Sequence, residues 1–155
     1  MSFNDIVTFG GTKVELSETL AATYDLAGFE DPSITWTEVG FLATAPQPDG
    51  VEWSDVSFNV VNSGDTQHRK GTKDRPEKSF DLYPADSDDG QVLLDVAKES
   101  REQYAMKVTY SNGEIHYLHA LIYNKNGDGG GNDDMRQQSV TFRVDPQGIV
   151  KGEVV

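Results

Sequence analysis

The sequence predicts a mainly β protein, a β-sandwich or barrel with one packed α-helix and long loops. Several segments alternate apolar and polar residues with a period of two, whereas a single segment over about 88–99 has apolar residues at helical spacing. Glycine and proline recur at turn-like positions between these segments. A chain of 155 residues is long enough to bury a core, and we expect one domain spanning 1–155.

The clearest strand signals lie in the second half of the chain. Alternation over 104–111 and an apolar run over 114–124 flank Asn112-Gly113, a strong signal for a tight hairpin. The segment 139–144 alternates in the same way. We therefore expect an antiparallel sheet built around these segments, with 12–16 and 78–85 as further strands.

Two long segments in the first half, 34–45 and 51–61, are also expected to be strands. In the second, Val51 and Trp53 are out of phase with the apolar residues that follow, which predicts a β-bulge near Ser54–Asp55. We expect Trp36 and Trp53 to pack in the core.

The helix over about 88–99 begins after Ser and Asp residues that suit an N-cap and a first turn. Its expected apolar stripe is Val92, Leu93, Val96 and Ala97. Residues 17–30 are compatible with a short helix or a loop.

The net charge of −13 and the absence of cysteine restrict the possible functions. Such an acidic surface repels nucleic acid and anionic lipid, and without cysteine the chain has neither a disulfide framework nor a thiolate metal site. The first residues do not form a signal peptide, and no apolar run is long enough to span a membrane. These features predict a soluble protein made in a reducing cytoplasm, with no membrane partner.

Positive charge is concentrated in one place. Five of the 13 basic residues fall within 69–78, in what the sequence predicts to be a charged loop over 66–80. This basic island has a net charge of +3, which leaves −16 for the other 145 residues. The two interpretations are a solvated surface loop and a positive contact that meets an acidic surface during assembly.

Metal binding and catalysis receive little support. Residues 124–134 match the first half of an EF-hand loop, but the twelfth position is Met135 instead of Glu, so a flexible hairpin tip is expected. His116 and His119 are three apart on an expected strand and point to opposite faces. No nucleophile or phosphate-binding motif is present, so we expect no catalytic residue, metal or cofactor.

The order of these pieces resembles the major tail tube proteins of long-tailed, non-contractile bacteriophages. The resemblance covers roughly 34–155. Gly71 and Asp74 match a G-x-x-D step in the charged loop. Asp88 or Asp89, together with Gly90 and Gln91, matches a D-x-G-Q helix start. A short hairpin, a loop with paired acids and a final strand pair follow in the same order. Residues 1–33 do not align and are expected to be an N-terminal arm or loop.

The resemblance implies a structural virion protein whose hexameric rings stack into a tail tube. Six copies at −13 each would bring −78 formal charges to a ring, so that viral DNA slides through the lumen without being bound. Implied partners are further copies of the chain, the tape measure protein and the tail terminator and tip proteins. The implied location is the virion tail, assembled in the host cytoplasm.

The residues expected to contact other subunits come from two regions. The basic island supplies inter-subunit or inter-ring contacts, and the loop 125–135 is expected to become ordered on assembly. The island residues are Arg69, Lys70, Lys73, Asp74, Arg75 and Lys78, and the loop residues are Asn126, Asp128, Asp133 and Asp134. The alternatives are a related component, such as a tail terminator or a type VI secretion tube-like protein, and a calcium-dependent β-sandwich binding module.

Overall fold

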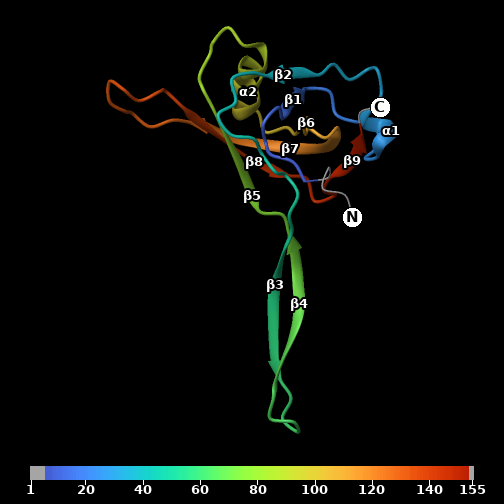
Figure 1. Cartoon of the computed structure of the whole chain (residues 1–155). Helices are drawn as coiled ribbons and strands as arrows, with labels where there is room; N and C mark the ends of the chain where they lie inside the picture. Colours follow the sequence, from blue (N-terminus) through green and yellow to red (C-terminus); the bar gives the residue numbers. More distant parts are fainter. Residues whose placement is uncertain (1–5, 154–155) are drawn as a thin grey trace.

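A computed structural model of the chain describes residues 6–153 (Figure 1). Within them, nine strands and two helices follow one another along the sequence. The elements are β1 (Lys13–Ser17), α1 (Leu26–Phe29), β2 (Thr37–Val39), β3 (Glu52–Asn59), β4 (Thr66–Asp74), β5 (Glu77–Leu82), α2 (Asp89–Glu99), β6 (Tyr104–Thr109), β7 (Glu114–Asn126), β8 (Gln138–Val144) and β9 (Val150–Glu153).

Seven strands form one antiparallel sheet in the order β2-β1-β6-β7-β8-β5, with β9 pairing to the first part of β7. The segment after β2 closes this sheet onto its far edge. Leu42 bridges Leu82, the Ala43 N–H donates to the Asp81 carbonyl at 2.8 Å, and the Tyr83 N–H donates to the Phe41 carbonyl at 2.8 Å. The sheet therefore curls into a small barrel, which leaves fewer open edges.

The barrel and α2 share one hydrophobic core. The alternating residues of β1, β6 and β8 point inward, and β7 is buried on both faces over most of its length. Buried core side chains of the barrel and α2 include Leu16, Phe80, Leu94, Met106, Leu118 and Phe142. The helix packs against β7 and β2 and covers one side of the barrel (Figure 1).

A second, smaller cluster fixes the segment 18–34 to the body. Phe29 of α1 is fully buried and stacks on Tyr117 with ring centroids 5.5 Å apart. Ala105 and Ile115 complete the buried part of this cluster.

The expected N-terminal arm or loop over 1–33 is largely part of the body. Since β1 already lies inside the main sheet, residues from Lys13 onward belong to the body. Residues 1–5 of the expected N-terminal arm lie outside the described residues.

A long hairpin of β3 and β4 is the most prominent feature outside the barrel. The two strands pair only with each other and project from one end of the body (Figure 1). Every residue of β3 is exposed, and so are all residues of β4 except the half-buried Gln67 and Gly71. We call residues 52–74 the arm.

Most of the elements expected from the sequence are confirmed. The predicted helix 88–99 is α2, and the predicted strands 104–111 and 114–124 are β6 and β7. The register shifts between Trp53 and Asp55, where a bulge was expected, but the extra residue belongs to β4, so Trp53 stays out of phase with Val56. Residues 17–30 contain the short helix α1. No helix among residues 6–153 is long and apolar enough to span a membrane.

Three expectations about local structure are wrong. The predicted strand 34–45 is regular only over Thr37–Val39, because Phe41 adopts a left-handed backbone conformation (φ 59°) where the chain crosses toward β5. The charged loop 66–80 is instead two strands, β4 and β5. In α2 the buried residues are Gly90, Gln91, Leu94 and Ala97, while Val92 and Val96 of the expected stripe face solvent.

Candidate assembly surfaces

The arm has two chemically different faces, which the pairing register defines. Val56 lies opposite Arg69 and Phe58 opposite Gln67, so these side chains share one face. Trp53 lies on the other face with Asp55, opposite Lys73, because β3 alternates without interruption and the extra residue of the bulge belongs to β4. We call Val56, Phe58 and Arg69 the docking face. Val56 and Phe58 are 50% and 43% exposed, which is unusual for neighbouring apolar side chains in one protomer.

The opposite face of the arm carries Trp53 and otherwise polar side chains, several of which bond to one another. His68 Nδ1 lies 3.0 Å from the Asp55 carboxylate, and the Thr66 hydroxyl donates to Asn59 Oδ1 at 2.8 Å. The bulge is also internally bonded, since the Thr72 N–H donates to the Ser54 hydroxyl at 2.8 Å. The docking face is thus the face of the arm that lacks a cover.

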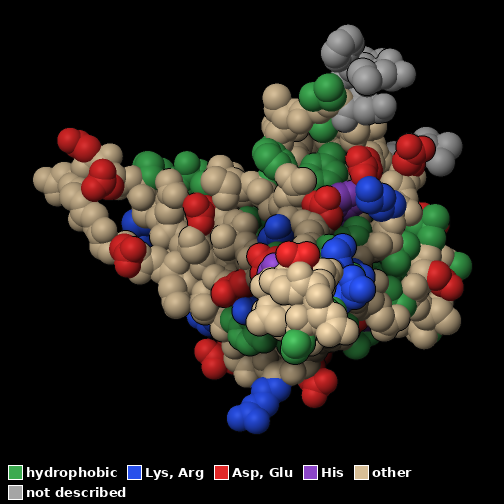
Figure 2. Space-filling view, turned by 90° about the horizontal axis from the view of Figure 1, so that it is seen from below, with side chains coloured by type: hydrophobic (Ala, Val, Ile, Leu, Met, Phe, Trp, Pro, Cys, Tyr) green, Lys and Arg blue, Asp and Glu red, His purple; other side chains and the backbone are tan. Residues whose placement is uncertain are grey.

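The positive charges of the basic island gather around one aromatic ring. The ammonium groups of Lys70 and Lys73 lie 5.2 Å and 5.8 Å from the centroid of the Trp53 ring. A cation near an indole ring is attracted by its π face. These contacts hold Trp53 on the surface, so its expected position in the core is wrong. Figure 2 looks along the arm from its tip and shows Lys and Arg side chains gathered beside it.

Two other residues of the island lie at the base of the arm. Arg75 donates from Nη1 to the Gly50 carbonyl at 3.2 Å and from Nε to the Pro146 carbonyl at 3.4 Å. Its side chain therefore fastens the arm to the barrel. Lys78 is half-buried in β5, opposite Phe142 of β8. Asp74 is exposed at the end of β4 and accepts a hydrogen bond from the Arg75 N–H.

The loop expected to respond to assembly forms the tip of the β7–β8 hairpin. Asn126 is the last residue of β7, and residues 127–137 are all exposed. The loop surrounds an open hollow of about 820 Å³. The Asp134 carboxylate accepts a hydrogen bond from the Gly131 N–H at 2.8 Å, so one of its oxygens already has a backbone partner. No group of three or more His, Cys, Asp or Glu residues placed to hold a metal ion occurs among residues 6–153.

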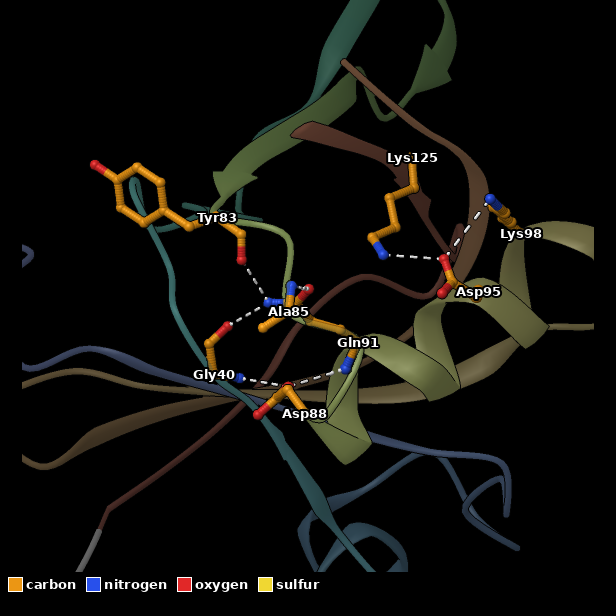
Figure 3. A network of polar contacts seen from close by, with 8 residues as sticks. All are labelled: Gly40, Tyr83, Ala85, Asp88, Gln91, Asp95, Lys98 and Lys125. Atoms are coloured by element: carbon orange, nitrogen blue, oxygen red, sulfur yellow. Dashed lines mark hydrogen bonds and ion pairs between the residues drawn. The ribbon is translucent and has the colours of Figure 1, made fainter. Parts of the chain in front are cut away.

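The start of α2 is held by a network of hydrogen bonds around a buried glutamine (Figure 3). The Gln91 side chain donates to the carbonyls of Gly40 (3.0 Å) and Tyr83 (2.9 Å) and accepts from the Ala85 N–H (2.8 Å). Asp88 caps the helix by accepting from the N–H groups of Gln91 and Gly40, both at 3.0 Å. Asp88, and not Asp89, is therefore the aspartate of the D-x-G-Q helix start.

The outer surface of α2 carries a short amphipathic stripe. Asp89, Val92, Val96 and Glu99 are all exposed and follow one another at spacings of three and four residues, which places them on one side of the helix. Val92 and Val96 are 48% and 52% exposed. We call these four residues the helix stripe.

Ion pairs on another side of α2 tie the helix to the sheet. Asp95 pairs with Lys125 of β7 at 3.0 Å and with Lys98 at 3.6 Å (Figure 3).

The two histidines of β7 occupy separate environments. His116 packs edge-on against Tyr110 and lies 3.0 Å from Glu114, whereas His119 packs against Tyr24 and Phe29. His119 Nε2 accepts a hydrogen bond from the Ala21 N–H at 3.0 Å, and burial lowers the pKa of this imidazole although Asp145 acts in the opposite direction. The two side chains thus serve packing.

Comparison with solved structures identifies the fold. The chain is similar to a protein of the anti-feeding prophage (AFP) baseplate, described as 6-fold symmetrised (TM-score 0.66, 10% identity, 99% of each chain). It is also similar to the SPP1 tail tube (0.62, 13%, 97% of this chain and 81% of that one). A third similar structure is the sheath/tube terminator of PVC, an extracellular contractile injection system (0.63, 7%, 95% and 96%).

The protein therefore has the tail tube fold, as expected from the sequence. No protein-family model matches the sequence, and no curated protein matches it. The match covers nearly the whole chain, so the barrel, α2 and the arm all belong to this fold.

Two surface features could not be identified from the sequence. The alternation of Val56 and Phe58, which forms the docking face of the arm, is equally typical of a strand with one buried face. The i, i+4 spacing of Val92 and Val96 in the helix stripe is equally typical of a helix face that packs on the core.

Proposed function

We propose that this chain is the tube subunit of a phage-type tail, in which six copies form a ring and rings stack into a tube. The observation that carries the proposal is the arm, a hairpin with an uncovered apolar and basic face that projects from a barrel with the tail tube fold. Isolated two-stranded hairpins are at best marginally stable in water, and an apolar face of this kind needs a cover. A second copy of the chain supplies one.

The basic island is then an assembly contact. Its net charge of +3 meets the −16 of the remaining residues when one copy approaches another. Arg69, Lys70 and Lys73 make the contact, whereas Arg75 holds the arm in place from its base. A positive surface inside the lumen would instead retain the phosphate backbone of passing DNA.

The proposed setting is a virion tail of the long, non-contractile kind, assembled in the host cytoplasm. The tube would surround the tape measure protein during assembly, bind terminator and tip proteins at its ends, and later conduct viral DNA through an acidic lumen without binding it. The six-fold symmetry stated for the AFP baseplate supports a ring of six. The work of such a subunit is structural, without a catalytic step.

A tube terminator is the second candidate, because the PVC terminator shares the fold. A terminator ends a tube, whereas a tube subunit adds copies at both ends. The present chain carries a projecting arm at one end of the body and an uncovered helix stripe at the other, which favours continued stacking (Figure 1).

The test is a triple charge reversal in the arm. We expect Arg69→Glu, Lys70→Glu and Lys73→Glu together to leave a folded monomer that no longer forms large assemblies in sedimentation velocity. The matched control reverses three exposed basic residues of the body, Lys13, Arg101 and Lys151, and keeps assembly. Normal assembly by the arm variant, or binding of duplex DNA by the unaltered arm, contradicts the assignment.

A further inference from the structure

The segment 18–34 crosses the side of the sheet away from the main core and buries few side chains of its own. It connects β1 to β2, and among residues 18–33 only Gly28 and Phe29 are buried. Its helix α1 lies beside β9 (Figure 1). We call this segment the strap. A segment with so little buried apolar surface can open while the barrel stays folded.

The contacts that hold the strap converge on His119 of β7. The Ala21 N–H donates to His119 Nε2 at 3.0 Å. The Tyr24 hydroxyl accepts from the His119 N–H at 3.1 Å and donates to the Gly148 carbonyl at 2.6 Å. The rings of Tyr24 and Phe29 pack edge-on against the imidazole, with centroid distances of 4.9 Å and 5.0 Å.

The hydrogen bond from Ala21 determines which form of His119 the closed strap accepts. A backbone N–H can only donate, so Nε2 carries no proton and the imidazole is neutral. Protonation of Nε2 would bring two donors face to face at the same position. Because His119 is only 7% exposed, water cannot supply the lost acceptor while the strap stays closed.

Asp145, on the turn after β8, is the carboxylate that attracts a charged His119. Both of its oxygens already have partners, since Oδ2 accepts from the Gln103 side chain at 2.8 Å and Oδ1 accepts from the Gln147 N–H at 2.9 Å. Burial outweighs this attraction and lowers the pKa of the imidazole. The closed strap therefore disfavours the imidazolium form.

The other groups around His119 keep their charge between pH 5 and pH 8. Burial raises the pKa of Tyr24 on the strap and of Tyr117, which shares a face of β7 with His119. Arg75, which acts on Tyr24, has a permanent charge. The residue of β6 opposite His119 is the uncharged Ala105. In this range, pH thus acts on the strap through His119.

We propose that the strap is a pH-sensitive device, which protonation of His119 opens while the barrel stays folded. Opening would uncover Ala105, Ile115 and Tyr117, the sheet residues that pack against Phe29. The inference does not depend on the proposed tube function, because every contact that carries it lies within one protomer.

Amide exchange of the full chain, followed by mass spectrometry and corrected for the intrinsic effect of pH on exchange, measures the opening. In the open strap His119 has an ordinary pKa of about 6.5. Below that pH the open state binds more protons than the closed state. We therefore expect the open fraction of residues 18–30 to rise about tenfold for each pH unit, until the lower pKa of the closed state is reached. The amides of β8 should keep their protection throughout.

Two variants separate the imidazole from the rest of the strap. We expect His119→Gln, which cannot be protonated, to remove the pH dependence of exchange in the strap. Tyr24→Phe is the matched control, because it removes a hydroxyl that holds the same segment and leaves the imidazole in place. It should raise the open fraction at every pH and keep the tenfold dependence.

Equal protection of the strap at pH 5 and pH 7.5 in the unaltered protein overturns the inference, and so does a pH response that persists in His119→Gln. Loss of protection in β8 together with the strap would show global unfolding, which also overturns it. None of these outcomes bears on whether the chain forms tubes.

Discussion

Gln91 shows at the scale of single residues why the D-x-G-Q sequence starts the helix. Its side chain satisfies two carbonyls and one N–H that belong to two different loops, after β2 and after β5, and it is 1% exposed. Gly90 is required for a separate reason: a Cβ at this position would lie 2.2 Å from the Glu38 carbonyl oxygen. The sequence pattern therefore reflects a close approach of α2 to β2.

Removing the Gln91 amide should be costly for the fold. We expect Gln91→Ala to lower the free energy of unfolding by about 3 kcal/mol, because buried groups that lose their partner cost about 1–3 kcal/mol each. Urea unfolding measures the change. The control, Gln147→Ala on an exposed turn, should stay within about 0.5 kcal/mol of the parent. A loss below about 1 kcal/mol for Gln91→Ala means that the network is not required.

His119 should make the stability of the body depend on pH. Burial lowers its pKa in the folded protein, while the unfolded chain has an ordinary value of about 6.5. Below about pH 6.5 the unfolded state therefore binds more protons, so the free energy of unfolding should fall until the pH passes the lower pKa of the folded state. Above about pH 6.5 the imidazole is neutral in both states and contributes no pH dependence.

Urea unfolding between pH 8 and pH 5 measures this effect as a difference between variants. We expect His119→Gln to be less sensitive to acid than the parent, and Gln147→Ala, on an exposed turn, to behave like the parent. Identical pH profiles for His119→Gln and the parent contradict the role of His119.

At the scale of elements, the arm is the part of the fold that the sequence did not predict. The helix and the strands of the barrel were predictable, because each buries one face of a single protomer and carries the matching apolar period. The strand β4 was not, because "TQHRKGTKD" has no apolar period. Neither of its faces is buried in one protomer. A pattern that another copy completes cannot be recognised as a core pattern from one chain.

In the monomer, the backbone hydrogen bonds of the arm should open often. We expect the amides of residues 52–59 and 66–74 to exchange quickly in the monomer, since a two-stranded hairpin without a covered face is marginally stable. They should exchange slowly in assembled protein. Amide exchange followed by mass spectrometry measures this, with β6 and β7 as the slow reference in both states. Arm amides that are already as slow as those of β7 in the monomer contradict the need for a partner.

The loop 125–135 should also change on assembly. Four of the residues 127–135 are glycine, which gives this tip a large backbone entropy, and we expect it to be mobile in the monomer and ordered in tubes. Trypsin should therefore cut after Arg136 quickly in the monomer and slowly in tubes. Equal cutting rates in the two states would show that assembly does not order the loop.

At the scale of the whole molecule, the proposed assembly depends on charge. A chain of net charge −13 repels its own copies, and in the proposed tube the basic island would provide the local attraction that overcomes this repulsion. The tail tube fold was predictable from the order of the motifs, whereas the direction of the arm relative to α2 required the structure. That direction makes a head-to-tail stack possible.

Salt should weaken this attraction. Raising the ionic strength from 0.15 M to 1 M shortens the Debye length from about 8 Å to about 3 Å, so contacts that depend on Arg69 and Lys73 should loosen. We expect the fraction of protein in large assemblies, measured by light scattering, to fall over this range. Assemblies that grow with salt would show that apolar contact alone drives stacking.

Electron microscopy of the concentrated, unaltered protein in low salt shows whether this chain builds tubes. We expect six-fold rings in end views and tubes with a regular axial repeat in side views. Particles that remain single protomers at every concentration, confirmed by sedimentation, would contradict this expectation.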